Sequence, residues 1–161
     1  MNKDNSISVR LMRKDDLEWV TDLGQNTPEF KTETSAAQFF SAETLRNWIN
    51  DPNGVTLVAE IDGRKAGFLL GCYITGPNDG YIKCTVIENV HRRKGVGREL
   101  QSSALEEFSQ KGLEGHKCDH VFSLVKDDDG PMLNLKREMG FEIGAKGYYV
   151  EIMLHPKGKE F

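Results

Sequence analysis

The stretch Val86–Leu100 reads Val-Ile-Glu-Asn-Val-His-Arg-Arg-Lys-Gly-Val-Gly-Arg-Glu-Leu, and the rest of the chain can be interpreted from it. An apolar, β-prone run is followed by a basic turn, and Gly95 and Gly97 then open a long amphipathic segment. The free N–H groups and the positive dipole end of a helix N-terminus attract anions. The stretch therefore predicts a strand, a phosphate-binding turn and a helix.

The residue types in this turn suit a pyrophosphate. Arg93 and Lys94 would bring charge to phosphate oxygens, and the two glycines would let the backbone approach closely. The dinucleotide fingerprint G-x-G-x-x-G needs a third glycine where this chain has Leu100, and the P-loop pattern is absent. A charged turn that merely enters a helix is the remaining alternative, and we favour the pyrophosphate site over it.

Hydrophobic periodicity on either side of this stretch predicts the other elements. The Asp62-Gly63 pair between two β-prone runs is a strong hairpin signal. The order β-α-α-β-β-β-α-β-α-β-β predicts an α+β (mixed α/β) domain, with a mostly antiparallel twisted sheet and helices on both faces. The expected strands are 7–12, 55–61, 65–74, 81–88, 120–125, 141–143 and 148–154, and the expected helices are 15–23, 42–49, 95–111 and 132–139.

Length and composition set further limits. The 161 residues fit a single domain over 1–161, with 155–161 expected as a frayed tail. A net charge of -4 argues against a nucleic-acid partner, and no apolar run is long enough to span a membrane. The three cysteines, Cys72, Cys84 and Cys118, are too scattered for a disulfide framework or a zinc site. We interpret them as reduced core residues and expect a cytoplasmic protein.

Two segments resemble the GNAT superfamily of N-acetyltransferases. The basic turn, Arg92-Arg93-Lys94-Gly95-Val96-Gly97, resembles the [QR]-x-x-G-x-[GA] motif of that family. The segment Leu135–Phe141, Leu-Lys-Arg-Glu-Met-Gly-Phe, resembles the family's helix that ends in Gly-Phe before the last two strands. The order of expected elements agrees as well, so the resemblance covers residues 7–154.

The resemblance implies acetyl-CoA as cosubstrate and no metal. The pyrophosphate would bind the backbone N–H groups of Arg93–Arg98, and the pantetheine arm would pair with the preceding strand like an added strand. The family separates that strand from the one expected at 120–125, and the acetyl group lies in the gap. The implied cofactor-binding residues are Thr85, Val86, Ile87, Arg92, Arg93, Lys94, Gly95, Val96, Gly97, Arg98 and Asp129.

Two positions depart from the family pattern. Asp129 stands where the family commonly has an Asn that touches the cofactor, and we favour a helix N-cap there over a cofactor or metal ligand. Lys136 stands where many members have a Tyr that protonates the departing thiolate. A lysine could donate a proton or neutralise the thiolate, but we expect a solvated helix residue. Tyr148 or Tyr149 could substitute, although core packing is the default.

The implied chemistry is direct attack of a primary amine on the thioester carbonyl, for which the amine must be neutral. A strand N–H near Val86 or Ile87 would stabilise the oxyanion. Glu88 lies only at the end of its strand, and Glu60 and Asp79 are expected to be solvated. The catalytic residues therefore stay unknown, with Tyr148 and Glu88 as weak candidates, and a water relay is our hypothesis.

The leading function is thus an acetyl-CoA-dependent N-acetyltransferase acting on a small-molecule amine, a protein N-terminus or a lysine. The alternative is a non-catalytic CoA-binding sensor or regulatory module. A nucleic-acid-binding module using the basic turn is a third hypothesis, which the acidic balance disfavours. The region 24–44, with Phe30, Phe39 and Phe40, is a candidate acceptor wall, although ordinary packing explains it equally well. We expect no nucleic-acid or membrane partner, and a homodimer stays open.

Overall fold

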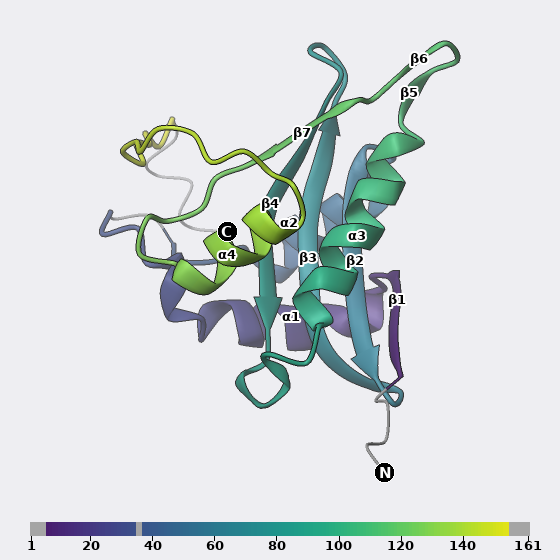
Figure 1. The fold of residues 1–161 in the computed structure, drawn as a ribbon. Coiled ribbons are helices and arrows are strands. Elements are labelled where there is room, and N and C mark those ends of the chain that lie inside the picture. Colours follow the sequence, from purple (N-terminus) through teal and green to yellow (C-terminus); the bar gives the residue numbers. More distant parts are fainter. Residues whose placement is uncertain (1–5, 35–36, 155–161) are drawn as a thin grey trace.

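The computed structural model describes residues 6–34 and 37–154. A five-stranded sheet in the order β1-β2-β3-β4-β7 forms its centre, and β5 and β6 make a small separate hairpin (Figure 1). The strands are β1 Ile7–Leu11, β2 Gly54–Ile61, β3 Arg64–Ile74, β4 Asp79–Ile87, β5 Gly112–Leu113, β6 His116–Lys117 and β7 His120–Ser123; the helices are α1 Leu17–Gln25, α2 Ala42–Asn50, α3 Val96–Ser109 and α4 Gly130–Glu138.

Helices cover both faces of the sheet. In Figure 1, α3 crosses the face that is turned to the viewer, with α4 beside it, and α1 and α2 lie behind. Each face has its own core: Leu57, Leu100 and Phe108 belong to the cluster on the α3 side, and Leu45 and Phe68 to the cluster on the α1 and α2 side. The predicted α+β class, with a mostly antiparallel sheet between helices, is confirmed.

A β-bulge divides β4 into two halves. Ile82 pairs with Gly71 and Cys84 with Leu70, so Lys83 has no partner on β3. An extra residue reverses the alternation of side chains along a strand. Ile82 therefore belongs to the core under α3, and Thr85, three residues on, also faces α3.

Strands β4 and β7 run in parallel and then separate. Their pairing extends from Asp79–His120 to Ile82–Ser123, where β7 ends, and the Ser123 Oγ donates to the Ile82 carbonyl at 3.0 Å. Strand β4 continues to Ile87, and within residues 6–34 and 37–154 no strand pairs with its outer edge after Ile82. In a strand, every second residue directs its N–H and C=O to the same edge, so this edge offers free backbone groups.

The predicted closing strands at 141–143 and 148–154 are wrong. The chain leaves α4 through Gly140, at φ 90°, and residues 141–154 contain no strand. Tyr148, Val150 and Ile152 are exposed, at 98%, 83% and 82%. Alternating apolar residues favour a strand only where a sheet edge is available to pair with them, and β7 ends after four residues.

Three smaller features complete the comparison with the expected elements. A 3-10 turn at Pro28–Phe30 and the β5–β6 hairpin are additional to the expected elements. The predicted tail at 155–161 lies outside the described residues. In the part of the chain that the structure covers, no helix has the length and apolar character needed to cross a membrane.

Candidate active site

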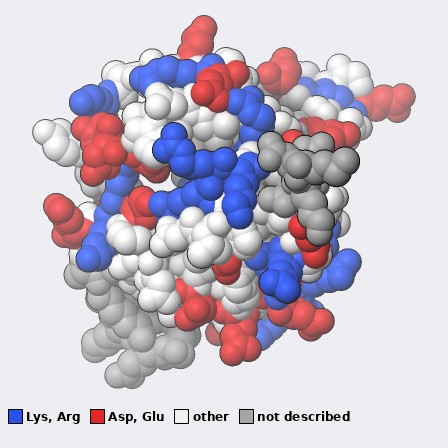
Figure 2. All heavy atoms as spheres, turned by 60° about the horizontal axis from the view of Figure 1, so that its bottom comes forward, with Lys and Arg blue, Asp and Glu red and all other residues white. Residues whose placement is uncertain are grey.

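The predicted anion-binding turn joins the end of β4 to α3. Gly95 is the N-cap of α3 in a left-handed conformation, with φ 89°, and Arg93 is also left-handed, with φ 63°. A non-glycine residue in this conformation is uncommon and costs about 1–2 kcal/mol. Figure 2 turns this end of the molecule forward and shows Lys and Arg side chains gathered near the centre of the face.

The four basic residues of the turn differ in their partners. Arg92 binds the Ile87 carbonyl at 3.3 Å and Glu29 at 3.5 Å, and Arg98 pairs with Glu138. Arg93 and Lys94 are exposed and have no ionic or hydrogen-bonding partner among the described residues. Two cations are therefore free to meet an anion at the N-terminus of α3, as a pyrophosphate site requires.

Gly97 lies where α3 and α4 approach each other. A Cβ added at this position would come within 3.2 Å of the Leu135 Cδ2, which is tighter than ordinary contact. A longer side chain would have to pass this neighbour or turn toward the N-terminal end of α3. The glycine thus keeps the first turn of α3 clear beside α4.

Lys136 is buried, so the expectation of a solvated helix residue is wrong. Its side chain is 1% exposed, and its Nζ donates to the Gln101 Oε1 at 2.7 Å. The same Nζ lies 4.2 Å from the centre of the Phe141 ring. Gln101 in turn donates from Nε2 to the Thr85 Oγ1 at 2.7 Å. The pattern of apolar and polar residues along α4 does not report this burial, because residues outside α4 cover the Lys136 side chain.

Burial lowers the pKa of Lys136 from 10.5 to about 8. No carboxylate pairs with this ammonium in the described part of the chain, so its charge is stabilised only by the Gln101 carbonyl oxygen and the Phe141 ring face. The residue at this position is therefore a weakly basic, enclosed amine near the open edge of β4. Sequence reasoning missed this environment.

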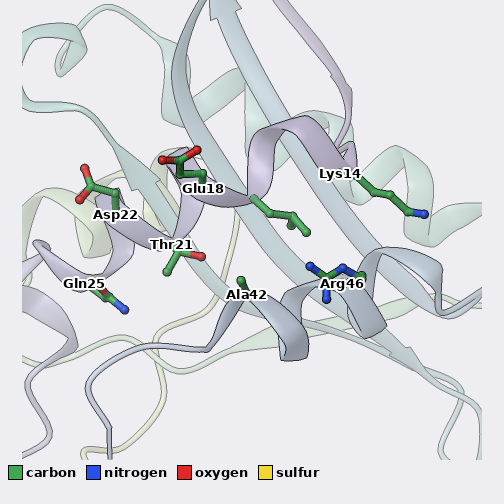
Figure 3. A pocket seen from close by; sticks show the side chains of 8 residues that line it. Lys14, Glu18, Thr21, Asp22, Gln25, Ala42 and Arg46 are labelled. Atoms are coloured by element: carbon green, nitrogen blue, oxygen red, sulfur yellow. The ribbon is translucent and has the colours of Figure 1, made fainter. Parts of the chain in front are cut away.

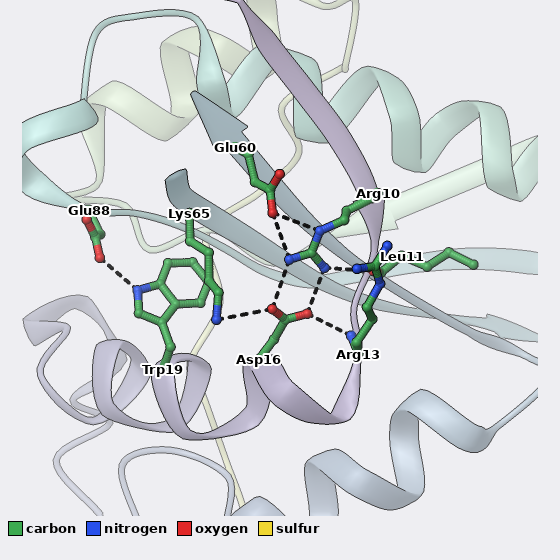
Figure 4. A network of polar contacts seen from close by, with 8 residues as sticks. All are labelled: Arg10, Leu11, Arg13, Asp16, Trp19, Glu60, Lys65 and Glu88. Carbon is green, nitrogen blue, oxygen red and sulfur yellow. Dashed lines mark hydrogen bonds and ion pairs between the residues drawn. The ribbon is translucent and has the colours of Figure 1, made fainter. Parts of the chain in front are cut away.

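Glu88, a weak catalytic candidate, is already engaged. The Trp19 Nε1 donates to the Glu88 Oε1 at 2.8 Å (Figure 4). The His91 Nε2 lies 3.8 Å from the other carboxylate oxygen. The pairing with Trp19 ties α1 to the end of β4. The carboxylate is therefore directed at the α1 side, away from the α3 face that carries Thr85.

An ion-pair network beside it fastens α1 to the sheet. Arg10 binds Asp16 at 2.8 and 3.0 Å and Glu60 at 2.8 Å, and Lys65 lies 3.3 Å from Asp16 (Figure 4). Burial would raise the pKa of Asp16, but hydrogen bonds from Arg10, the Arg13 N–H and Lys65 outweigh it and lower that pKa to about 2. Glu60, expected to be solvated, is thus a structural partner of Arg10.

The other candidates occupy varied surroundings. Tyr148 is 98% exposed, so the expected core packing is wrong, and Tyr149 donates to Glu151 at 2.7 Å. Asp129 caps α4 by accepting from the Met132 N–H at 3.1 Å, as favoured from the sequence. Asp79, expected to be solvated, binds His120 at 2.9 Å.

The three phenylalanines of the predicted acceptor wall are partly buried and pack against the core on the α1 and α2 side. Phe39 stacks on Phe30 with ring centres 5.2 Å apart and contacts Phe40 edge-on at 5.3 Å. A Cβ on Gly24 would collide with the Phe39 ring, so α1 closes directly over it. Ordinary packing accounts for all three side chains.

The cysteines are free thiols, as predicted. Burial raises the pKa of the Cys84 thiol to about 12, so it stays protonated near the gap between β4 and β7. Within the described ranges, no group of three His, Cys, Asp or Glu residues is placed to hold a metal ion.

An open groove of about 570 Å³ lies between α1 and α2 (Figure 3). None of the predicted cofactor residues lines it. Its walls carry both charges, with Lys14 and Arg46 near one end and Glu18 and Asp22 toward the other. The groove is therefore separate from the β4 edge and the anion-binding turn.

Comparisons with known proteins agree with this geometry. The sequence matches the profile of the Acetyltransferase (GNAT) family over residues 18–141. The search of curated proteins found no significant match.

Solved structures with low sequence identity share the fold. Aminoglycoside N-acetyltransferase AAC(6')-Iy, solved with CoA, has a TM-score of 0.71 and 16% identity, covering 94% of this chain and 98% of that chain. The ribosomal-protein-S18-alanine N-acetyltransferase from Escherichia coli has a TM-score of 0.68 and 14% identity, covering 87% and 80%. The aminoglycoside acetyltransferase meta-AAC0020 from an uncultured soil metagenomic sample has a TM-score of 0.68 and 17% identity, covering 91% of this chain and 97% of that chain.

The family profile spans most of the chain, and the fold, the glycine-containing turn and the separated strands agree with it. This protein belongs to the GNAT acetyltransferase family.

Proposed function

We propose that this protein transfers the acetyl group of acetyl-CoA to a primary amine by direct attack of the amine on the thioester. The observation that carries the proposal is the open edge of β4 after Ile82, which leads directly to the N-terminus of α3. An extended pantetheine arm can pair with that edge as an added strand, at Thr85, Val86 and Ile87. Its pyrophosphate then meets the turn.

The turn supplies what the pyrophosphate needs. Arg93 and Lys94 carry unpaired charge among the described side chains, and the backbone N–H groups from Arg93 to Arg98 open α3. Arg92 and Arg98 have protein partners on either side and would flank the site. Asp129 caps α4, so its contact with the cofactor is the weakest member of the proposed set.

The acceptor is proposed as an amine of modest pKa. Deprotonating a lysine-like amine at pH 7 costs about 4–5 kcal/mol, whereas an α-amine costs about 1–1.5 kcal/mol. Glu88 is bound to Trp19, and Tyr148 points into solvent, so neither offers a free base at the gap. A water relay serves an α-amine better than a lysine.

The same observations support the second candidate, a CoA-binding sensor without catalysis. The two candidates differ in turnover and agree in binding. We propose, in either case, that residues 1–161 form one domain, and the free cysteines fit a reducing cytoplasm. A homodimer stays a prediction.

The test is calorimetry with acetyl-CoA on the wild type and three glycine variants. Gly97→Glu puts bulk and negative charge at the first turn of α3 and should abolish binding. Gly97→Ala controls for the contact with Leu135, and Gly76→Glu controls for added charge, because nothing lies within 4 Å of a Cβ there. Thiolate release with an aminoglycoside, a peptide N-terminus and a lysine peptide then separates enzyme from sensor. A wild type that does not bind acetyl-CoA would refute both candidates.

A further inference from the structure

A line of three polar side chains crosses the interior and ends at the open edge of β4. Lys136 on α4 and Gln101 on α3 are 1% and 0% exposed, and Thr85 on β4 is half-buried. The Lys136 Nζ to Gln101 Oε1 distance and the Gln101 Nε2 to Thr85 Oγ1 distance are both 2.7 Å. Burying such groups is costly unless they are hydrogen-bonded, so the line needs a reason.

Chemistry fixes the direction of the line. A lysine ammonium can only donate, so the Gln101 amide must present its oxygen to Lys136. The amide nitrogen is then left to donate to the Thr85 hydroxyl. The hydroxyl accepts this bond and keeps its own hydrogen free. Across the described residues, no acceptor takes that hydrogen.

The free hydrogen belongs to a residue beside which the proposed cofactor would pass. Thr85 comes after the last β4–β7 pair, Ile82–Ser123, on a part of β4 whose outer edge is open. Because of the bulge at Lys83, the Thr85 side chain lies on the face of the sheet that carries α3 and α4. The Lys136 ammonium orients the Gln101 amide, and the amide in turn leaves the hydrogen of the Thr85 hydroxyl unused. This arrangement fits a ligand that brings an acceptor oxygen.

We propose that Lys136 and Gln101 hold the Thr85 hydroxyl as a hydrogen-bond donor to a carbonyl oxygen of the acyl-donor arm, in the gap between β4 and β7. The inference rests on the proposed function, because it needs acetyl-CoA along this edge. Thr85 touches the cofactor, whereas Lys136 and Gln101 act through it and are positioning residues.

The line depends on the protonation of Lys136. A neutral amine accepts as well as donates, so the Gln101 amide can turn and the Thr85 hydroxyl loses its fixed role. On the packed helices, Arg98 binds Glu138 and Arg137 binds Asn134 at 3.3 Å, whereas Glu99, Glu106 and Glu107 are exposed. Binding of acetyl-CoA should therefore weaken as pH rises past about 8, where the buried Lys136 loses its proton.

Calorimetry tests this with acetyl-CoA itself, so no acceptor is needed. Thr85→Val should weaken binding about 10-fold, the effect of one hydrogen bond, and Thr85→Ser should restore it. Lys136→Met should weaken binding at neutral pH to a similar extent and abolish the alkaline decline seen in the wild type. Thr85→Val combined with Lys136→Met should be no weaker than Thr85→Val alone, because both changes remove the same contact.

Other results overturn the inference. Wild-type affinity in Thr85→Val, a Thr85→Ser variant as weak as Thr85→Val, or additive losses in the double variant would each do so. If Lys136→Met fails to fold, the valine and serine variants decide the question alone. Failure of the wild type to bind acetyl-CoA refutes the proposed function as well, whereas wild-type binding with an unaffected Thr85→Val refutes this inference only.

Discussion

The Trp19 indole N–H donates to the Glu88 carboxylate at 2.8 Å, joining α1 to the end of β4 across 69 positions of sequence. The bond gives the carboxylate that directly follows β4 a structural contact. We therefore expect Glu88, a candidate base by its sequence position, to have a structural role.

Replacing Glu88 tests that assignment. Glu88→Gln keeps an amide oxygen that can accept from Trp19, so we expect catalytic efficiency within about 3-fold of the wild type and the same pH profile. Glu88→Ala leaves the indole N–H without its partner and should cost about 1–3 kcal/mol of unfolding free energy. Steady-state rates over pH, together with urea unfolding, measure both. If Glu88→Gln removed the acidic limb of the pH–rate profile, Glu88 would be the base.

Asp16 should dominate the acid stability of the fold. Its carboxylate is 2% exposed and pairs with Arg10 and Lys65, so Asp16→Asn removes both ion pairs, leaves Arg10 with Glu60 alone and should lower the unfolding free energy by about 2 kcal/mol. Because the folded pKa is about 2, below the usual 3.8, its contribution is complete above pH 3.8 and disappears as pH falls through 2. Unfolding of the wild type and Asp16→Asn over this range measures the difference. Asp15→Asn, at an exposed neighbour, should have little effect.

Lys136 should produce the opposite pH dependence. Its folded pKa of about 8 lies below the unfolded value of 10.5, so between these values the unfolded chain binds more protons. Stability should therefore rise with pH across this window by about 3 kcal/mol, and Lys136→Met should lack the rise. The difference between the two unfolding curves isolates this group. Parallel curves would mean that Lys136 is solvated in solution.

Replacing Arg93 with glycine should make the fold more stable and weaken the binding of acetyl-CoA. Its left-handed backbone is strained, so Arg93→Gly should gain about 1 kcal/mol in unfolding free energy. The same change removes a cation from the turn, and acetyl-CoA affinity should fall about 3- to 10-fold, less so at high salt. Lys94→Ala removes charge without relieving strain and is the matched control. Equal stability changes in the two variants would contradict the backbone argument.

Local signals predict much of this fold. The Asp62-Gly63 pair forms the expected hairpin turn, with φ values of 50° and 79°, because two adjacent left-handed residues suit a tight turn between twisted strands. The basic turn and Gly95 open α3 for the same local reason. The prediction for residues 141–154 fails because strand formation there depends on a pairing edge. The prediction for Lys136 fails because its cover comes from outside α4, which no pattern within that helix reports.

The unpaired Lys83 on β4 has a consequence for how this strand tolerates change. Upstream of it, even-numbered side chains belong to the α3 core, as Ile82 does; downstream, Cys84 and Val86 belong to the opposite core. Deleting Lys83 would restore a regular ladder, in which Cys84 follows Ile82 directly and both residues keep their present sides of the sheet. Thr85 would likewise stay on the α3 side, and the buried line from Lys136 would keep its end. The bulge can thus absorb the loss of one residue from β4 without moving Thr85 or the anion-binding turn relative to β3.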